Sequence, residues 1–270
     1  MPSSARFGAL AIVAVAVACV EKTPLSPGPD VIAVHAVLNP AERVQHVVVV
    51  RRPEAGTRYD RPVSGATVSF VAPSGATLAA TEVSTPSEYP DVAKMPSPHY
   101  DIVTSAVAVG QPYRLRVVLP TGEVVEGETV APAAAPATSA TERRLDRSID
   151  TLRLSWPRVP GARAYEVRVS AKRDPLTWYG GGYVTYADTA VTLPGSARPH
   201  GRPIFIEGSS YDLVVSAVDT NYYMYYGFDS DQYTGTSLPT SLRGAVGVFG
   251  ALVPIVRMSI TVEGVSPAAR

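Results

Sequence analysis

The chain has 270 residues, with 24 Lys and Arg balanced by 24 Asp and Glu, and 46% of its residues are hydrophobic. That hydrophobic content excludes an intrinsically disordered chain, because enough apolar surface is present to offset the entropy lost on folding. The zero net charge argues against nucleic acid as a partner, since phosphates select a concentrated basic face. With four His and one Cys, the sequence predicts no metal site and no cofactor.

The N-terminal segment is typical of an export signal. Residues 1–18 place one positive charge, Arg6, ahead of an uncharged apolar stretch that ends in small residues. As a helix, residues 7–18 would cover only about 18 Å, too short for the roughly 30 Å hydrocarbon core of a bilayer. The stretch ends at Cys19, the only cysteine in the sequence, so no intramolecular disulfide can form.

The sequence Ala16-Val17-Ala18-Cys19 resembles a bacterial lipobox, in which the cysteine becomes the new N-terminus and carries the lipid. The resemblance implies lipid attachment at Cys19 and, with Val20 following, an anchor in the outer membrane of a two-membrane bacterium, facing the periplasm or the surface. The alternative is an ordinary secretion signal with an incidental cysteine. Residues 19–30 contain several prolines and predict an extended tether of roughly 30 Å.

From residue 31 onward, short alternating apolar runs broken by Gly, Pro, Asn and Asp predict strands. We expect a first β-sandwich over residues 31–133, carboxypeptidase-regulatory/transthyretin-like or Ig-like in kind. Pro120-Thr121-Gly122 predicts a hairpin turn, and Tyr113, Leu115 and Val117 should share the inward face of the strand before it. The predicted strands cover 31–38, 45–52, 63–71, 76–83, 99–104, 112–119 and 123–130.

A second β-sandwich is predicted over residues 148–265, after a linker at 134–147 that is rich first in Ala, Pro, Thr and Ser and then in charge. The whole chain is therefore predicted as all-β, with two β-sandwich domains in series. The alternating residues Leu152, Leu154 and Trp156 should point inward, as should Tyr165, Val167 and Val169 on the return strand. Further strands are expected at 188–195 and 209–221.

This second half resembles the fibronectin type III module. The resemblance rests on Trp156 at the end of one strand, on Tyr165-x-Val167 on the next, on the inward Leu193 before Pro194-Gly195, and on the Tyr211–Val215 segment. It implies that Tyr211 is the tyrosine-corner residue, whose hydroxyl ties its strand to the preceding loop. A fold of this kind does not fix a function.

The mature chain as a whole also resembles a bacterial lipoprotein family, domain of unknown function 4249. The lipobox, the Pro-rich tether, the Val63–Val68 segment, Gly110-Gln111-Pro112-Tyr113 and the Gly-rich strand at 244–250 carry this resemblance. It implies an envelope lipoprotein of a kind often linked with outer-membrane transport systems. None of these motifs is catalytic.

Two aromatic clusters are candidate contact sites for a protein or glycan partner. Tyr222, Tyr223, Tyr225 and Tyr226 open a predicted long loop at 220–243, and loops on a rigid sandwich often carry binding residues. The alternative is a loop that packs its own aromatics, with Tyr223 and Tyr225 inward.

The second cluster, Trp178 and Tyr179, precedes three glycines. These aromatics either form a rim with the first cluster or belong to a turn in which Trp178 covers the edge of the sandwich.

The sequence is poor in catalytic patterns. Its histidines, His35, His46, His99 and His200, are scattered, and the acidic pair Glu126 and Glu128 is expected to face water. Asp229-Ser230-Asp231 lacks the later glutamate of a calcium loop. We therefore expect no enzyme but a lipid-anchored binding or accessory protein, and the family resemblance implies a place beside an outer-membrane receptor or transporter. The alternatives are a structural envelope spacer and a carboxylate-based hydrolase.

Overall fold

The computed structural model describes residues 30–52, 60–84, 96–104, 107–133, 143–171, 182–186 (backbone only), 189–196, 204–226 and 240–263. Almost all regular structure in these residues is β, with one short helix, which confirms the predicted all-β fold. No helix within these ranges is long and apolar enough to cross a membrane. The predictions for Cys19, Trp178 and Tyr179 concern residues outside the described ranges.

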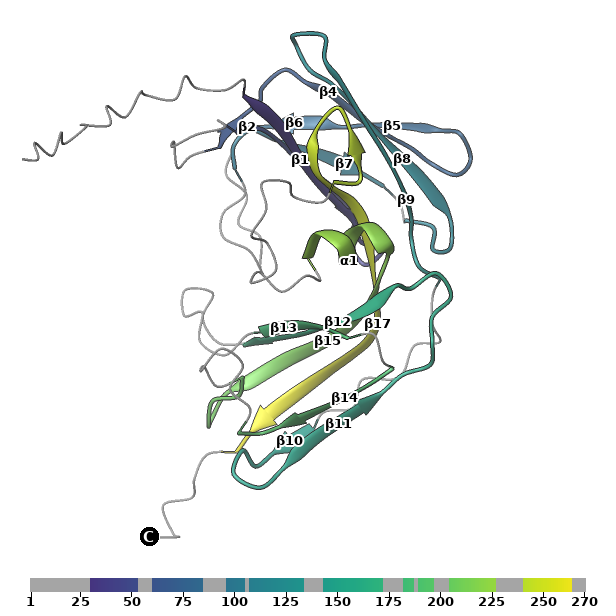
Figure 1. Ribbon diagram of the computed structural model, residues 1–270. Coiled ribbons are helices and arrows are strands. Elements are labelled where there is room, and N and C mark those ends of the chain that lie inside the picture. The colour runs from purple at the N-terminus through teal and green to yellow at the C-terminus, as the bar shows by residue number, and fades with distance from the viewer. Residues whose placement is uncertain are drawn as a thin grey trace, which may run out of the picture.

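The N-terminal sandwich consists of two facing layers (Figure 1). One layer contains, in order, β1 (Val31–Leu38), β2 (Val44–Arg52), β7 (His99–Val103) and β6 (Thr81–Val83), with β3 (Arg61–Pro62) also on β2. The other contains β16 (Leu242–Arg243), β9 (Val124–Val130), β8 (Pro112–Val118), β4 (Thr67–Val71) and β5 (Thr77–Ala79). Alternate residues of both layers fill the core, and the predicted inward residues Tyr113, Leu115 and Val117 are all buried there.

The hairpin predicted at 120–122 is confirmed. β8 and β9 pair antiparallel, and the Gly122 N–H donates to the Leu119 carbonyl at 2.9 Å. Two other strands are shorter than predicted. The run at 63–71 is a strand only from Thr67, and the run at 76–83 is divided at Ala80, because β5 pairs with β4 in one layer and β6 pairs with β7 in the other.

The C-terminal sandwich sets a layer of two strands, β11 (Thr151–Ser155) and β14 (Ala190–Pro194), against a larger layer. The larger layer contains β13 (Gly182–Tyr186), β12 (Ala164–Ala171), β15 (Ser210–Val218) and β17 (Val246–Val262), with β10 (Arg143–Leu145) also on β17. The residues predicted to alternate inward on β11 and β12 are buried. The predicted tyrosine corner is confirmed, because the hydroxyl of the buried Tyr211 accepts a hydrogen bond from the Ile206 N–H at 2.7 Å.

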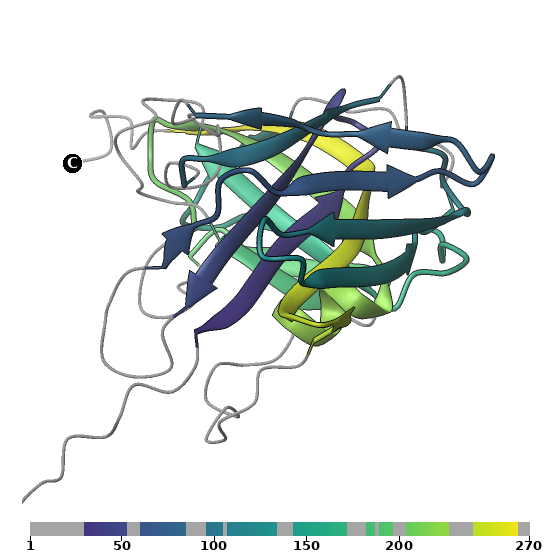
Figure 2. The same cartoon turned by 90° about the horizontal axis from the view of Figure 1, so that it is seen from above.

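Strand β17 belongs to both sandwiches. Residues 246–251 pair parallel with β1, and residues 252–261 pair antiparallel with β15, so one ten-stranded sheet runs through the molecule. Figure 2 shows β17 (yellow) passing from the N-terminal sandwich, nearer the viewer, into the strands behind it. The predicted allocation of the whole range 148–265 to the second sandwich is therefore wrong for residues 242–251. They complete the first sandwich, because the chain crosses back to it after β15.

Candidate functional site

The first residues of the predicted aromatic loop form a helix, α1 (Thr220–Tyr226). Asp219 caps it, since its Oδ1 accepts the Tyr222 N–H at 2.9 Å. A helix this short is marginal on its own and depends on packing against the rest of the protein. Aspartate is a residue type that commonly caps helices, but the resemblance to a fibronectin module, in which this segment is the loop before the last strand, favoured a loop.

The helix packs Tyr222 and Tyr226 against the shared sheet. Tyr222 is buried, forms a small apolar cluster with Ala164 and Val218, and donates its hydroxyl to the buried Glu166 carboxylate. Burial raises the pKa of Tyr222 well above its ordinary value, with the nearby Glu166 carboxylate as a further cause. Tyr226 contacts the His35 ring and its hydroxyl bonds to His35 Nε2. The helical period places these two tyrosines inward, whereas a strand-like period predicted Tyr223 and Tyr225.

The base of α1 connects the two sandwiches. Asn221 donates its side-chain amide to the carbonyls of Glu128 on β9, at 2.7 Å, and Phe249 on β17, at 2.9 Å. Asp219 Oδ2 accepts the Thr129 hydroxyl at 2.6 Å, and its Oδ1 accepts the Ala251 N–H at 3.0 Å. Burial raises the pKa of the Asp219 carboxyl, and these hydrogen bonds oppose that rise. The predicted contact segment is thus partly a structural joint.

Tyr225 has different surroundings from the other α1 tyrosines, because it lines a groove. The groove has a volume of about 310 Å³ and lies on the outer face of β1 and β2. Its floor is largely apolar, with Ala33, Val48 and Val50, and its rim carries the Arg52–Asp60 ion pair, with both N–O distances 2.9 Å. Tyr223 instead stacks with Arg163, whose guanidinium carbon lies 4.7 Å from the ring centre.

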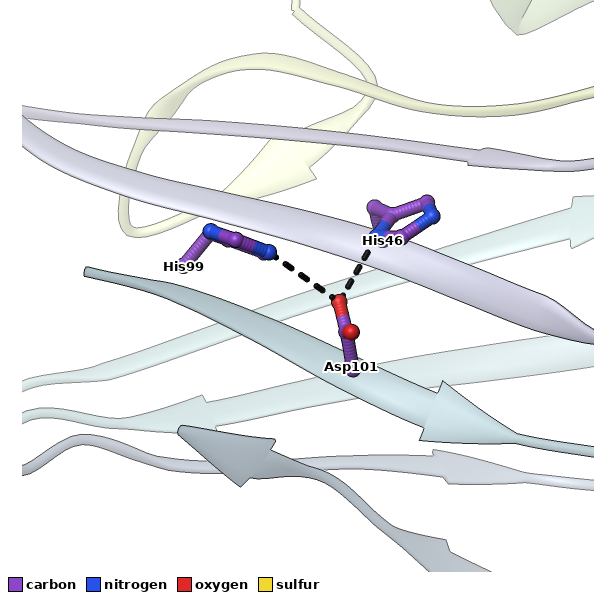
Figure 3. Close-up of side chains that lie close together, drawn as sticks. All are labelled: His46, His99 and Asp101. Carbon is purple, nitrogen blue, oxygen red and sulfur yellow. Dashed lines mark hydrogen bonds and ion pairs between the residues drawn. The ribbon is translucent and has the colours of Figure 1, made fainter. Parts of the chain in front are cut away.

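Two of the scattered histidines meet at an aspartate on the outer face of the same sheet (Figure 3). His46 on β2 is the direct cross-strand partner of Asp101 on β7, and His99 precedes Asp101 by two residues, which places all three on one face. His46 Nδ1 lies 2.6 Å, and His99 Nε2 3.4 Å, from Asp101 Oδ1. The expectation of no metal-binding histidine pair overlooked this cluster, because 53 residues separate His46 from His99 (99 − 46 = 53).

The acidic pair on β9 faces outward, as predicted. Glu126 pairs with Arg243, and Glu128 lies 3.7 Å from Arg114 with its side chain 77% exposed. These carboxylates belong to a cross-strand row of opposite charges on the sheet surface. The calcium-like Asp229-Ser230-Asp231 lies outside the described residues.

Comparison with known proteins adds little to this geometry. No protein-family model and no curated protein matches the chain. Among solved structures, chicken CNTN1 FN1-FN3 domains match with 13% identity and a TM-score of 0.27, over 87% of this chain and 68% of that one. DIP-gamma IG1+IG2 matches with 9% identity and a TM-score of 0.19, over 86% and 98%. The fold assignment rests on the strand pairing described above, and the resemblance to domain of unknown function 4249 stays a prediction.

Proposed function

We propose that this protein is a lipid-anchored envelope protein with a non-enzymatic binding or accessory role, of the kind seen in the domain of unknown function 4249 family. The anchor is supported by Cys19, the sole cysteine, placed between an export-type segment and a Pro-rich tether. A β-sandwich of the fibronectin or Ig type supports a binding role, although the fold alone does not fix one. An outer-membrane receptor or transporter is the setting we favour.

The groove beside Tyr225 carries the proposed binding role. It combines an apolar floor with a partly buried tyrosine and a charged rim, which is the composition of a contact site for a protein or glycan partner. Tyr225 also approaches the His35 ring edge-on, but it differs from the other α1 tyrosines in lining the groove. Those tyrosines bond or stack with Glu166, His35 or Arg163 and position the helix.

The anchor is tested first. Cells producing the wild-type protein or Cys19→Ala are labelled with a fatty-acid analogue and fractionated. We expect label and membrane association in the wild type, because several acyl chains on Cys19 would form a stable anchor. We expect loss of both in the variant, which has no cysteine to carry the acyl chains. Unlabelled, soluble wild-type protein would contradict the lipid anchor and the outer-membrane location.

The groove is tested separately by photo-crosslinking in intact cells. A crosslinking residue at position 225 is compared with one at position 153, an exposed site on β11. A crosslinked species formed from position 225 alone supports binding through the groove. Equal yields from both positions, or none from either, would contradict it.

A structural spacer is the second candidate, and the shared strand β17 favours it. Because β17 and the base of α1 join the sandwiches, the folded part can hold a fixed length and angle. A variant with a filled groove, Ala33→Trp, separates the two roles. It should leave a spacer unaffected and abolish the crosslink from position 225.

A further inference from the structure

The strongest unassigned feature is the cluster of His46, His99 and Asp101 on β2 and β7. We propose that His46 Nδ1, His99 Nε2 and Asp101 Oδ1 bind a divalent transition-metal ion, with Zn²⁺ as the probe of choice. Imidazole nitrogen and carboxylate oxygen are donors that Zn²⁺ accepts, and three protein ligands with an open fourth position are a known arrangement for zinc.

The hydrogen bonding of His99 prepares its ring as a ligand. His99 is fully buried, and its Nδ1 lies 3.3 Å from the Pro96 carbonyl oxygen, which can only accept a hydrogen bond. Nδ1 therefore carries a proton, and in the neutral ring Nε2 presents a lone pair. A metal-binding histidine commonly donates its other ring N–H to a backbone carbonyl in this way.

The lone pair of His99 meets no hydrogen-bond donor among the residues that the structure describes. Nε2 is buried, has no hydrogen-bond partner within those residues, and points toward Asp101 Oδ1, 3.4 Å away, which also presents lone pairs (Figure 3). Two acceptors that face each other are unfavourable where one of them is fully buried, as His99 is, unless a positive charge lies between them. A bound cation supplies that charge and satisfies both atoms.

A proton on His99 Nε2 is the competing explanation. It would create a buried imidazolium whose bond to Asp101 is long, so the desolvation cost would be poorly offset. Without an ion, His46 Nδ1–H donates a hydrogen bond to the same oxygen at 2.6 Å. A bound ion would replace this proton, so that His46, Asp101 and His99 all gain a ligand bond.

The spacing of the three donor atoms suits a small ion. They lie within 4.8 Å of one another, against about 3.3 Å between ligand atoms around a tetrahedral zinc. His46 Nδ1 and Asp101 Oδ1 lie closer than that, at 2.6 Å, so side-chain rotation must separate this hydrogen-bonded pair to admit the ion. The side chains of His46 and Asp101 are 14% and 24% exposed, which leaves solvent access for the ion and for a fourth ligand.

The test is titration of the metal-free chain with Zn²⁺ by calorimetry, with Cys19→Ala in every sample so that no thiol competes. We expect one strong site per chain, and binding at least about 100-fold weaker in both His99→Gln and Asp101→Asn, since even an outer-shell partner is commonly worth 10–100-fold. His35→Gln, which changes a histidine of β1 on the same sheet, should bind as the parent does. Co²⁺ in place of Zn²⁺ should give visible ligand-field absorption in the parent but not in His99→Gln or Asp101→Asn.

The two cluster variants guard against a folding artefact, and far-UV circular dichroism checks each. Zn²⁺ should also raise the unfolding temperature of the parent and of His35→Gln but not of Asp101→Asn. Absence of a one-to-one site in the parent would overturn the proposal. If a folded His99→Gln or Asp101→Asn variant bound Zn²⁺ as tightly as the parent, the proposal would also be overturned, because the metal would then bind elsewhere.

Discussion

At the scale of single residues, His35 shows how α1 alters the chemistry of the sheet beneath it. Tyr225 and Tyr226 approach the ring edge-on, at centroid distances of 6.2 and 5.8 Å. Burial lowers the pKa of His35 from 6.5 to about 4, and a backbone hydrogen bond opposes part of that shift. The folded protein therefore takes up this proton at a much lower pH than the unfolded chain does.

This difference predicts acid sensitivity of a defined sign. Between about pH 6.5 and pH 4 the unfolded state binds more protons, so the free energy of unfolding should fall as the pH drops through that window. The loss reaches up to ~3 kcal/mol, at 1.36 kcal/mol per pKa unit. We expect a smaller loss in His35→Gln, measured by urea unfolding at pH 7 and pH 4 in metal-free buffer. Parallel losses in both proteins would show that His35 does not carry the effect.

At the scale of elements, α1 is held by contacts that its own sequence does not reveal. A Cβ at Gly250 would lie 2.9 Å from the Tyr222 backbone nitrogen and 3.1 Å from Asp219 Oδ1, so the glycine on β17 admits the close approach of the helix. Together with the two bonds from Asn221, this contact fixes α1 across β9 and β17.

Removing the Asn221 amide should loosen this joint. Asn221→Ala leaves two carbonyls, of Glu128 and Phe249, without their side-chain donor, and we expect a cost of about 1–3 kcal/mol in the free energy of unfolding. Thr220→Ala, at the exposed neighbouring position, is the matched control and should cost less than about 0.5 kcal/mol. Denaturant unfolding of both variants measures the difference, and equal costs would contradict the role of Asn221.

Local pattern was enough to predict most strands but not the site. Alternation identified β1, β8, β9 and β12 as strands, and it gave the inward faces of β8, β11 and β12, because period two is set within each strand. The His46–Asp101 pairing depends on which strands become neighbours, and the position of α1 depends on a glycine 28 residues later than Tyr222 (250 − 222 = 28). Both are long-range facts that a local reading of the chain does not contain.

At the scale of the whole molecule, the shared strand should make the two sandwiches unfold together. Melting either sandwich removes a partner from β17 and so exposes part of the other. We expect a single calorimetric transition. Leu115→Ala in the first sandwich and Leu213→Ala in the second should each lower that same transition, with costs of about 2–5 kcal/mol. Two transitions, each moved by one variant only, would indicate independent domains.

The parallel pairing of β1 with β17 also has a mechanical consequence. The predicted N-terminal tether precedes β1 in the chain, whereas the far end of β17 lies in the second sandwich. A pull between the tether and that end would draw the two strands in opposite directions along their length. The six paired positions from Ala33 to Leu38 would then be sheared together rather than peeled apart one by one, so the joint is built to resist tension along the strand axis.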